Sequence, residues 1–376
     1  MQANHKTIAK NAIRGTVKFL SLAVNVAFSF ILIVAAYSDR VSPEKTLIIS
    51  YIGLLFPLWS VINLCFIMYW VFLKKWKYTL VGIVTVLICI NPILRYTPFN
   101  SKSENIPKEN TIKVLTYNIM FFAFQDHTKE KPNPIIEYII KSDADIVCLQ
   151  EFQASKSEQN LNLNKIKKAL SIYPYSHIEF YADDASNKMG IAVFSKYKIL
   201  KSRKIEYKSE GNGSTIHELK INDKTLTLVN NHLESFKLTM EDRSNYTKFI
   251  QKPGTDAFGD LRGSINNKIG PALMKRAKQA QIIRKEINNI ESDYTIVCGD
   301  FNDTPISYVL RTIQGEDLKD AFVESGFGFG NTYNQNLFWF RIDHILYSPN
   351  MEAINCTVDK VEYSDHYPVL CYLKMN

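Results

Sequence analysis

The sequence predicts an α/β domain that follows a membrane segment. Three observations support this prediction. Long uncharged runs fill most of the first 95 residues, buried strand patterns alternate with helix patterns in the remainder, and acidic, amide or histidine side chains stand at the ends of several of these strands. Strand-helix-strand passages are typical of α/β folds, and polar groups at strand ends are typical of their functional sites.

The net charge of +8 is unevenly distributed along the 376 residues. The first 100 residues contain ten Lys or Arg and only two acidic residues, Asp39 and Glu44, so they carry the whole excess. The remaining residues contain 35 basic and 35 acidic side chains. Residues 101–376 are therefore not a basic nucleic-acid-binding module. The excess positive charge of the first 100 residues bears on membrane topology instead.

Three uncharged runs predict membrane helices. They cover Phe19–Ser38, Thr46–Leu73 and Tyr78–Leu94, which have 20, 28 and 17 residues, against roughly 20 needed to cross a bilayer as a helix. A cleaved signal peptide has a shorter apolar core and is not followed at once by a longer apolar run. We therefore expect residues 1–95 to be a retained, multi-pass membrane segment.

Basic residues flank these runs asymmetrically. They precede the first run and separate the second from the third, at Lys6, Lys10, Arg14, Lys18, Lys74, Lys75 and Lys77. By the positive-inside rule the N-terminus is cytoplasmic, and three spans place everything after Arg95 outside the cytoplasm, as in a bacterial inner membrane. If Tyr78–Leu94 is only re-entrant, the large domain has the opposite orientation. The runs contain only the polar interruptions Asn25, Asn63 and Asn91 and no charged site, which excludes a channel or transporter.

Residues 96–110 are polar and turn-rich and predict a linker. The soluble domain, 111–376, then begins with a β-branched and aromatic strand over Ile112–Ile119, which contains Asn118 near its end. An Asn at this place is usually a turn former.

A short helix over Pro134–Lys141 and a buried strand over Asp145–Leu149 follow. This strand leads directly to Glu151. A carboxylate at a strand end is either a solvated side chain or a metal ligand, and both interpretations stay open here.

The next elements are predicted as a helix over Asn162–Leu170, a strand over Gly190–Phe194, and a hairpin with arms Ile216–Leu219 and Leu226–Val229. The second arm leads to His232. A histidine there is either a hydrogen-bonded structural group or an acid–base group.

A long polar stretch lies between Ser235 and Pro271. Loops of this length are usually functional or mobile. Tyr246, Phe249 and Phe258 within it either pack on the domain or form a lip that faces lipid.

An amphipathic helix over Met274–Ile290 leads into the strand Tyr294–Cys298, which is followed at once by Gly-Asp-Phe-Asn-Asp. Asp300 and Asn302 are two residues apart, so both point to the same side of an extended chain. A carboxylate and an amide oxygen that converge at a strand end suit a hard divalent cation or a phosphoryl group. The same residues also form turns and helix caps.

The C-terminal part repeats this theme. The alternating strand Phe340–Tyr347 carries Asp343, and Asp365-His366 precedes the final strand. A carboxylate adjacent in sequence cannot orient the imidazole well, so a second acid such as Asp343 or Glu151 is needed to make His366 a base or a phosphate-binding cation.

The six cysteines include no CxxC pair. Cys148, Cys298 and Cys371 lie in apolar runs and are predicted as buried thiols. For Cys356, a disulfide with another cysteine stays an open alternative.

Taken in chain order, these segments resemble the endonuclease/exonuclease/phosphatase superfamily of deoxyribonuclease-like, metal-dependent phosphohydrolases. The resemblance covers about Thr111 to Leu373 and rests on the motifs LTYNI, LQE, NNHLES, GDFND, RIDHI and SDHYPV. It implies a four-layer α/β/β/α sandwich, with the site where the strand ends of both sheets meet.

The resemblance also implies a role for each matching residue. Glu151 corresponds to the principal metal ligand, with Asn118 beside it and Asp365 close to the metal. Asp300 corresponds to the residue that aligns or deprotonates the attacking water, and Asn302 to a phosphate or metal partner.

His232 and His366 resemble the histidine pair that contacts the scissile phosphate, and Asp343 resembles the acid that orients one of them. Mg²⁺ (or Mn²⁺) and an imidazolium offset the charge on the phosphorane, so that chemistry needs no covalent enzyme intermediate. Met120 departs from the pattern, because some nuclease members have an acid two residues after the Asn. This departure puts a second metal position in doubt.

The sequence thus predicts a membrane-anchored, divalent-metal-dependent hydrolase of phosphodiester or phosphomonoester bonds, with no obligate protein partner. Its substrate is expected to be nucleic acid, a phospholipid head group or a small phosphodiester. Balanced charge argues against processive duplex binding, although a local patch for a shorter substrate is available at Lys268, Lys275, Arg276 and Lys278. The alternative is a catalytically silent member that acts as a membrane-tethered binding or scaffold protein. Suitable residues at every expected catalytic position argue against it.

Overall fold

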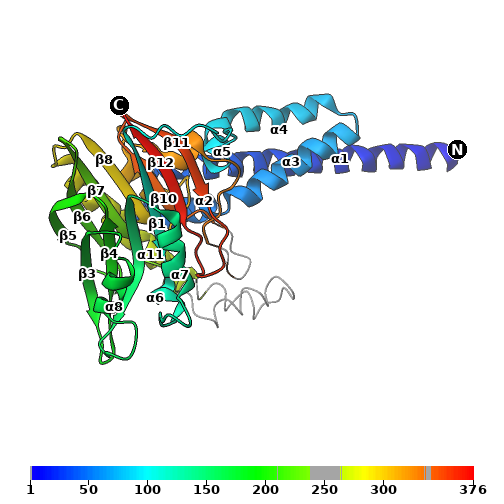
Figure 1. The fold of residues 1–376 in the computed structure, drawn as a ribbon. Coiled ribbons are helices and arrows are strands. Elements are labelled where there is room, and N and C mark those ends of the chain that lie inside the picture. The colour runs from blue at the N-terminus through cyan, green and yellow to red at the C-terminus, as the bar shows by residue number, and fades with distance from the viewer. Residues whose placement is uncertain (1, 210, 238–262, 264, 334, 336–339) are drawn as a thin grey trace. The chain divides into compact units, whose positions relative to one another are not determined.

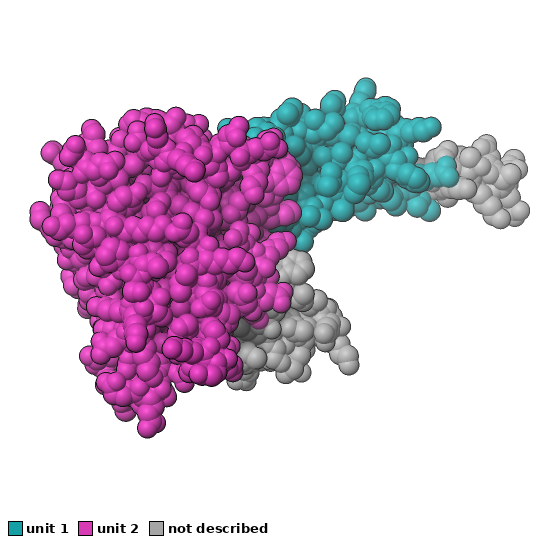
Figure 2. Space-filling model, viewed as in Figure 1, with its two compact units in different colours: residues 1–95, 306–308 teal, residues 96–305, 309–376 magenta. Residues whose placement is uncertain are grey.

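The computed structural model describes residues 2–209, 211–237, 263, 265–333, 335 and 340–376. The chain divides into two compact units, which are residues 1–95 with 306–308, and residues 96–305 with 309–376 (Figure 2). Tyr246, Phe249 and Phe258, the predicted lip, lie outside the described residues.

The first unit is helical (Figure 1). Its elements are α1 (Gln2–Ala36), η1 (Ser38–Arg40), α2 (Leu47–Leu54), α3 (Phe56–Phe72), α4 (Trp76–Ile88) and α5 (Ile90–Tyr96). Within α1, Ala12–Ala36 is long and apolar enough to cross a bilayer. The pairs α2–α3 and α4–α5 pass the same test only together, with bends of 61° and 62°.

The sequence thus predicts about three membrane helices, whereas the described residues contain one continuous helix of that kind. Pro57 stands in the first turn of α3, and Pro92 stands near the start of α5. Proline cannot donate the backbone hydrogen bond that would continue a helix from the preceding turn, so each predicted run is divided there.

Two of the polar interruptions in these helices, Asn25 and Asn63, are bonded to side chains of a neighbouring helix. Trp70 Nε1 donates to Asn25 Oδ1 at 3.0 Å, and Asn63 Nδ2 donates to Ser29 Oγ at 3.2 Å. All four side chains are buried. These bonds tie α1 to α3, which is the usual use of isolated polar groups between apolar helices.

The second unit contains two six-stranded sheets (Figure 1). The first has the spatial order β11 (Met351–Val358), β12 (Val369–Met375), β1 (Thr111–Asn118), β2 (Ile146–Ser155), β4 (Asn187–Ser195) and β3 (Tyr175–Asp183). The second has the order β5 (Lys198–Ile205), β6 (Gly213–Ile221), β7 (Lys224–His232), β8 (Tyr294–Asp300), β10 (Asp343–Tyr347) and β9 (Lys319–Asp320). The pairs β1–β2 and β7–β8 are parallel, and the other pairs are antiparallel.

Alternation along the strands sorts the apolar side chains into layers. Val114 and Cys148 of the first sheet meet Leu228 and Ile296 of the second in one buried cluster. The neighbouring residues face outward, against α7 (Pro134–Ser142) and α8 (Leu163–Ala169) on the first sheet, and against α11 (Gly270–Asn288) and α12 (Tyr308–Gln314) on the second. This confirms the predicted α/β fold with two sheets, arranged as α/β/β/α.

Short elements complete the unit, namely α6 (Met120–Ala123), η2 (Ile265–Ile269) and α13 (Ala321–Ser325). All six cysteines are free, including Cys356. The predicted linker has no helix or strand beyond α5, but part of it is bonded to the second unit. Asn100 Nδ2 donates to Val323 O at 2.8 Å, and Ser103 N donates to Asn355 Oδ1 at 2.9 Å.

Candidate active site

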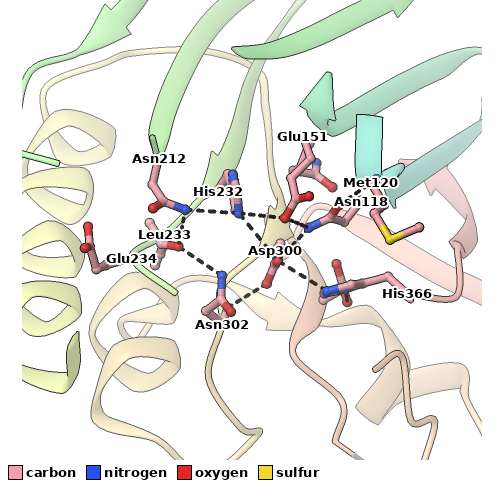
Figure 3. A network of polar contacts seen from close by, with 12 residues as sticks. Asn118, Met120, Glu151, Asn212, His232, Leu233, Glu234, Asp300, Asn302 and His366 are labelled. Carbon is pink, nitrogen blue, oxygen red and sulfur yellow. Dashed lines mark hydrogen bonds and ion pairs between the residues drawn. The ribbon is translucent and has the colours of Figure 1, made fainter. Parts of the chain in front are cut away.

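The alternation that builds the core also places polar side chains on the inner face at the strand ends (Figure 3). Asn118, His232 and Asp300 each close a strand. In the sheet register, Asp300 lies opposite His232 of β7 and opposite Asp343 of β10. The two sheets therefore bring four of the predicted residues to one place.

Buried amides connect the two sheets beside this place. Gln150 Nε2 donates to Thr116 Oγ1 at 3.1 Å and to Asn230 Oδ1 at 2.7 Å. Asn230 Nδ2 in turn donates to the backbone oxygens of Leu149 and Ala192, at 3.3 and 3.1 Å. Separating the strand ends would leave these groups unpaired, which costs about 1–3 kcal/mol for each.

Glu151 reaches the site through a β-bulge. Leu149 faces the outer helices, so strict alternation would turn Glu151 toward them as well. Instead, the β2–β4 register shifts between Leu149 and Phe152, and Glu151 has a φ of 49°. Phe152 again faces the outer helices. The extra residue lets Glu151 point toward the inner face, and β2 continues beyond the predicted end at Leu149 to Ser155.

Asp300 is the centre of the polar network and is fully buried. Its Oδ2 atom accepts a hydrogen bond from Asn118 Nδ2 at 3.1 Å and lies 3.8 Å from Nε2 of both His232 and His366. Burial and then the Asp343 carboxylate raise the pKa of Asp300 to about 6, although both histidines act in the opposite direction. A carboxyl with this pKa accepts a proton near neutral pH.

His366 is paired with Asp343. Its Nδ1 atom lies 2.9 Å from Asp343 Oδ2, and Thr332 Oγ1 accepts from the Asp343 backbone N–H at 3.1 Å. Burial alone would lower the pKa of His366, but Asp343 and Asp300 outweigh it and raise that pKa well above its usual value. His366 is therefore an imidazolium at neutral pH.

His232 is held in a different state. Asn212 Nδ2 donates to the Leu233 carbonyl at 3.0 Å, which fixes the orientation of this amide, and it also lies 3.0 Å from His232 Nε2. His232 thus accepts at Nε2, and its Nδ1 lies 3.3 Å from the Tyr181 hydroxyl. Burial, as the largest cause, lowers the pKa of His232. The two histidines of the site therefore differ in charge.

Asn118 connects Glu151 to Asp300. Its Nδ2 atom donates to Glu151 Oε1 at 3.1 Å as well as to Asp300, and its Oδ1 accepts from Met120 N at 3.2 Å. Burial and then the Asp365 charge raise the pKa of Glu151. The Glu151 Oε1 atom also lies 3.8 Å from His232 Nε2.

The other two predicted residues lie at the edge of this network. Asn302 N donates to Asp300 Oδ1 at 2.8 Å, and Asn302 Nδ2 donates to the Leu233 carbonyl at 3.0 Å. Asp365 is half-buried and accepts from Ser364 Oγ at 3.3 Å. Asp365 thus acts on Glu151 through its charge.

Among the described residues, Asp300, Asp343 and His366 offer ligand atoms that all lie within 4.8 Å of one another. Asp343 Oδ1 is buried without a hydrogen-bond partner. Two carboxylates, one of which has an unpaired buried oxygen, fit a hard divalent cation. This compact group differs from the predicted metal set of Glu151, Asn118 and Asp365, which adjoins it through the Asn118 bond to Asp300.

Several supporting residues were not predicted from the sequence, namely Tyr181, Asn212, Thr332 and Ser364. Tyr181 and Asn212 contact His232, and Thr332 contacts the Asp343 backbone. Of these four residues, only Ser364 belongs to one of the six motifs. The sequence Gly211-Asn212-Gly213 predicts a turn, but it does not predict the contact between Asn212 and His232.

Residues 115–366 match the model of the Endonuclease/Exonuclease/phosphatase family, which covers more than half of the chain, and the protein belongs to this family. Residues 17–96 match a model described as a domain of unknown function. No curated protein matches the chain. Enzymes of the family generally use divalent metals, and the buried acidic and histidine group is the corresponding feature here.

Two solved structures show the same fold. An endonuclease/exonuclease/phosphatase from Beutenbergia cavernae has a TM-score of 0.50 at 14% identity, with 71% of this chain and 72% of that chain covered. A family protein from Leptotrichia buccalis has a TM-score of 0.50 at 14% identity, with 70% and 100% covered. At these identities the similarity concerns the fold alone.

Proposed function

We propose that the protein is a membrane-anchored, divalent-metal-dependent hydrolase of phosphoesters, in which water attacks phosphorus in line. The observation that carries this proposal is the position of Asp300. Its carboxylate is fully buried between a neutral and a cationic histidine, and its pKa of about 6 suits a base. A base, a cation and an aligned ester are sufficient to expel an alcohol without a covalent intermediate.

Each side chain has a part in this proposal. Asp300 orients the attacking water and takes its proton, while Asn302 positions the phosphate. His366, charged through Asp343, donates to an oxygen on which negative charge accumulates. His232 lies 3.8 Å from Asp300 Oδ2 and corresponds to the second histidine that the family pattern places beside the phosphate. A cationic donor fixed in a buried site stabilises developing charge without reorganisation.

The residues that would hold the metal are Glu151, Asn118 and Asp365, as the family pattern implies, together with Asp343, whose Oδ1 atom is buried without a hydrogen-bond partner. When bound, Mg²⁺ or Mn²⁺ would neutralise charge on the phosphate and its leaving group. The side chains supply mostly carboxylate oxygens, which these cations prefer.

We further propose that residues 1–95 anchor the protein through about three spans, of which α2–α3 and α4–α5 are bent, followed by a linker over 96–110 and the catalytic domain over 111–376. The charge pattern supports a cytoplasmic N-terminus and a catalytic domain outside the cytoplasm, in a bacterial inner membrane.

Balanced domain charge and a bilayer anchor favour phospholipid head groups, short nucleic acids or small phosphodiesters as substrates.

The test uses the full chain in nanodiscs, with Mg²⁺, and measures hydrolysis of bis(p-nitrophenyl) phosphate, nicking of supercoiled plasmid and release of head groups from phospholipid. We expect activity that a chelator abolishes and that His232→Ala reduces by about 10²-fold or more. His177→Ala is the matched control, because His177 is a half-buried histidine outside the site. Metal binding by a folded chain with no activity on any of the three substrates would instead support a scaffold.

A further inference from the structure

Three exposed phenylalanines form a patch on the second unit. Phe327 and Phe329, in the segment Gly-Phe-Gly-Phe-Gly that follows α13, are 70% and 54% exposed, and Phe99 beside them is 64% exposed. Single exposed apolar residues are common on protein surfaces. The Phe99 and Phe327 rings contact each other, and Phe327 and Phe329 line the same cavity. A contiguous apolar surface of this kind usually marks an interaction site.

Backbone bonds fix the two segments that carry Phe99 and Phe327. Phe99 and Phe327 form an isolated antiparallel bridge, and their rings lie 5.9 Å apart at 82°. Gly328 N donates to Pro98 O at 2.8 Å, and Asn100 N donates to Gly326 O at 3.2 Å. Phe99 and Phe327 therefore lie on backbone that hydrogen bonds hold in place.

A cavity of about 720 Å³ opens beside the rings. Phe327, Phe329, Lys102 and Lys360 line it, and both lysines are exposed. Aromatic rings beside lysines are typical of surfaces that meet a bilayer, because the rings enter the boundary between head groups and acyl chains while the ammonium groups reach the phosphates.

The position of the patch in the chain identifies its partner. Phe99 lies three residues after Tyr96, the end of α5, and three extended residues reach at most about 10 Å. The head-group region is roughly 5–8 Å deep on each side of the hydrocarbon core. If α4–α5 spans the membrane, Phe99 and the Phe327 bonded to it must lie in or next to that region.

We propose that Phe99, Phe327 and Phe329, with Lys102 and Lys360, form a lipid-contact surface that docks the catalytic unit on a phospholipid bilayer. This inference rests on the membrane anchoring proposed above. It goes beyond anchoring, since it assigns a second contact with lipid, made by the folded domain itself.

The experiment places an environment-sensitive fluorophore, NBD, on single cysteines of the full chain in nanodiscs. Cys65, the one exposed cysteine of the six, is first changed to Ser. NBD on Phe327→Cys is compared with NBD on Ile172→Cys, which is 44% exposed and lies outside the patch. The readout is quenching by lipids that carry a nitroxide near the head group.

We expect several-fold stronger quenching at position 327 than at position 172, and a further increase when anionic phosphatidylglycerol is added. Lys102→Glu with Lys360→Glu should remove that increase. Equal quenching at both positions would overturn the inference. A blue shift at position 327 without nitroxide quenching would also overturn it, since the ring would then be covered by protein or by a soluble ligand.

A third label separates this inference from the anchoring on which it rests. Val24→Cys lies in α1 and is 46% exposed within the unit. If NBD at position 24 is quenched by nitroxides in the acyl chains while position 327 is not, anchoring stands and docking fails. If position 24 is not quenched, the anchoring itself is wrong.

Discussion

The two site histidines differ in charge because neighbouring carboxylates outweigh the effect of burial on the pKa of His366, whereas burial has the largest effect on the pKa of His232. His366 faces the carboxylates of Asp343 and Asp300, whereas His232 receives a hydrogen bond from the neutral amide of Asn212. Opposite effects on the pKa of two neighbouring groups are a common way to separate acid and base roles. The same oxygen, Asp300 Oδ2, lies 3.8 Å from both rings.

Changing Asp343 to Asn tests the charge on His366. The variant keeps a similar shape but removes the carboxylate that outweighs burial, so the pKa of His366 should fall. We expect about 10²–10⁴-fold lower kcat at neutral pH, with the loss smaller at pH 6 than at pH 8. Steady-state assays across this range measure it, and Asp184→Asn on the exposed surface is the control. A loss that is the same at every pH would contradict the explanation.

Changing Asp300 to Asn tests the cost of burying this carboxylate. The folded-state pKa is raised from 3.8 to about 6, so the protonated form stabilises the metal-free fold below pH 4, and this stability is lost as pH rises through 6. This change in the free energy of unfolding is on the order of 3 kcal/mol. Above pH 6 in a chelator, we expect the variant to unfold at a higher temperature than the wild type, although it is inactive.

Thermal unfolding of the second unit between pH 4 and 8 measures this difference. The advantage of the variant should shrink as the pH is lowered. A difference that does not depend on pH would show that Asp300 is not destabilised by its surroundings.

At the scale of elements, the strand ends depend on one close approach. Gly299 has a φ of 125°, and a Cβ there would lie 2.1 Å from the backbone oxygen of Asn231 on the neighbouring strand. Since Asp300 follows directly, the separation of β7 and β8 at this point sets the position of the central carboxylate.

We therefore expect Gly299→Ala to destabilise the second unit by about 2–4 kcal/mol, because the methyl group forces β7 and β8 apart and the φ suits only glycine. Chemical denaturation measures the loss. Gly211→Ala is the matched control, since Gly211 also has a positive φ but no atom within 4 Å of its Cβ position. Equal losses in both variants would show that the dihedral angle alone matters.

The sequence allowed prediction of the elements whose apolar side chains follow a clear period, such as α11, β1 and β8. It did not reveal β3 and β5, because their residues, apart from the buried Ile205, are half-buried or exposed and carry little apolar alternation. The bulge at Glu151 was also not predictable, since one extra residue leaves no mark in a pattern of period two. The motifs identified the charged residues of the site, while their supports, Tyr181 and Asn212, come from segments without a recognisable pattern.

At the scale of the whole molecule, metal binding should distinguish the two units. A cation that binds only the folded site stabilises it by about 2.7 kcal/mol at a hundredfold excess over Kd. We expect Mg²⁺ or Mn²⁺ to raise the unfolding temperature of the second unit, a chelator to reverse the rise, and Asp343→Asn to reduce it. The helical unit should unfold at an unchanged temperature. A rise that persists in Asp343→Asn would exclude Asp343 from the metal site.

The first strand of the second unit, β1, pairs with β12, the last strand in chain order, with Thr111 opposite Lys374. Contacts between residues so far apart in sequence form late and slowly. During synthesis, the apolar helices and most of both sheets leave the ribosome before β12 does. A nascent chain that lacks β12 therefore has neither the strand that joins β1 to β11 nor His366, so the proposed hydrolysis requires that translation has passed Met375.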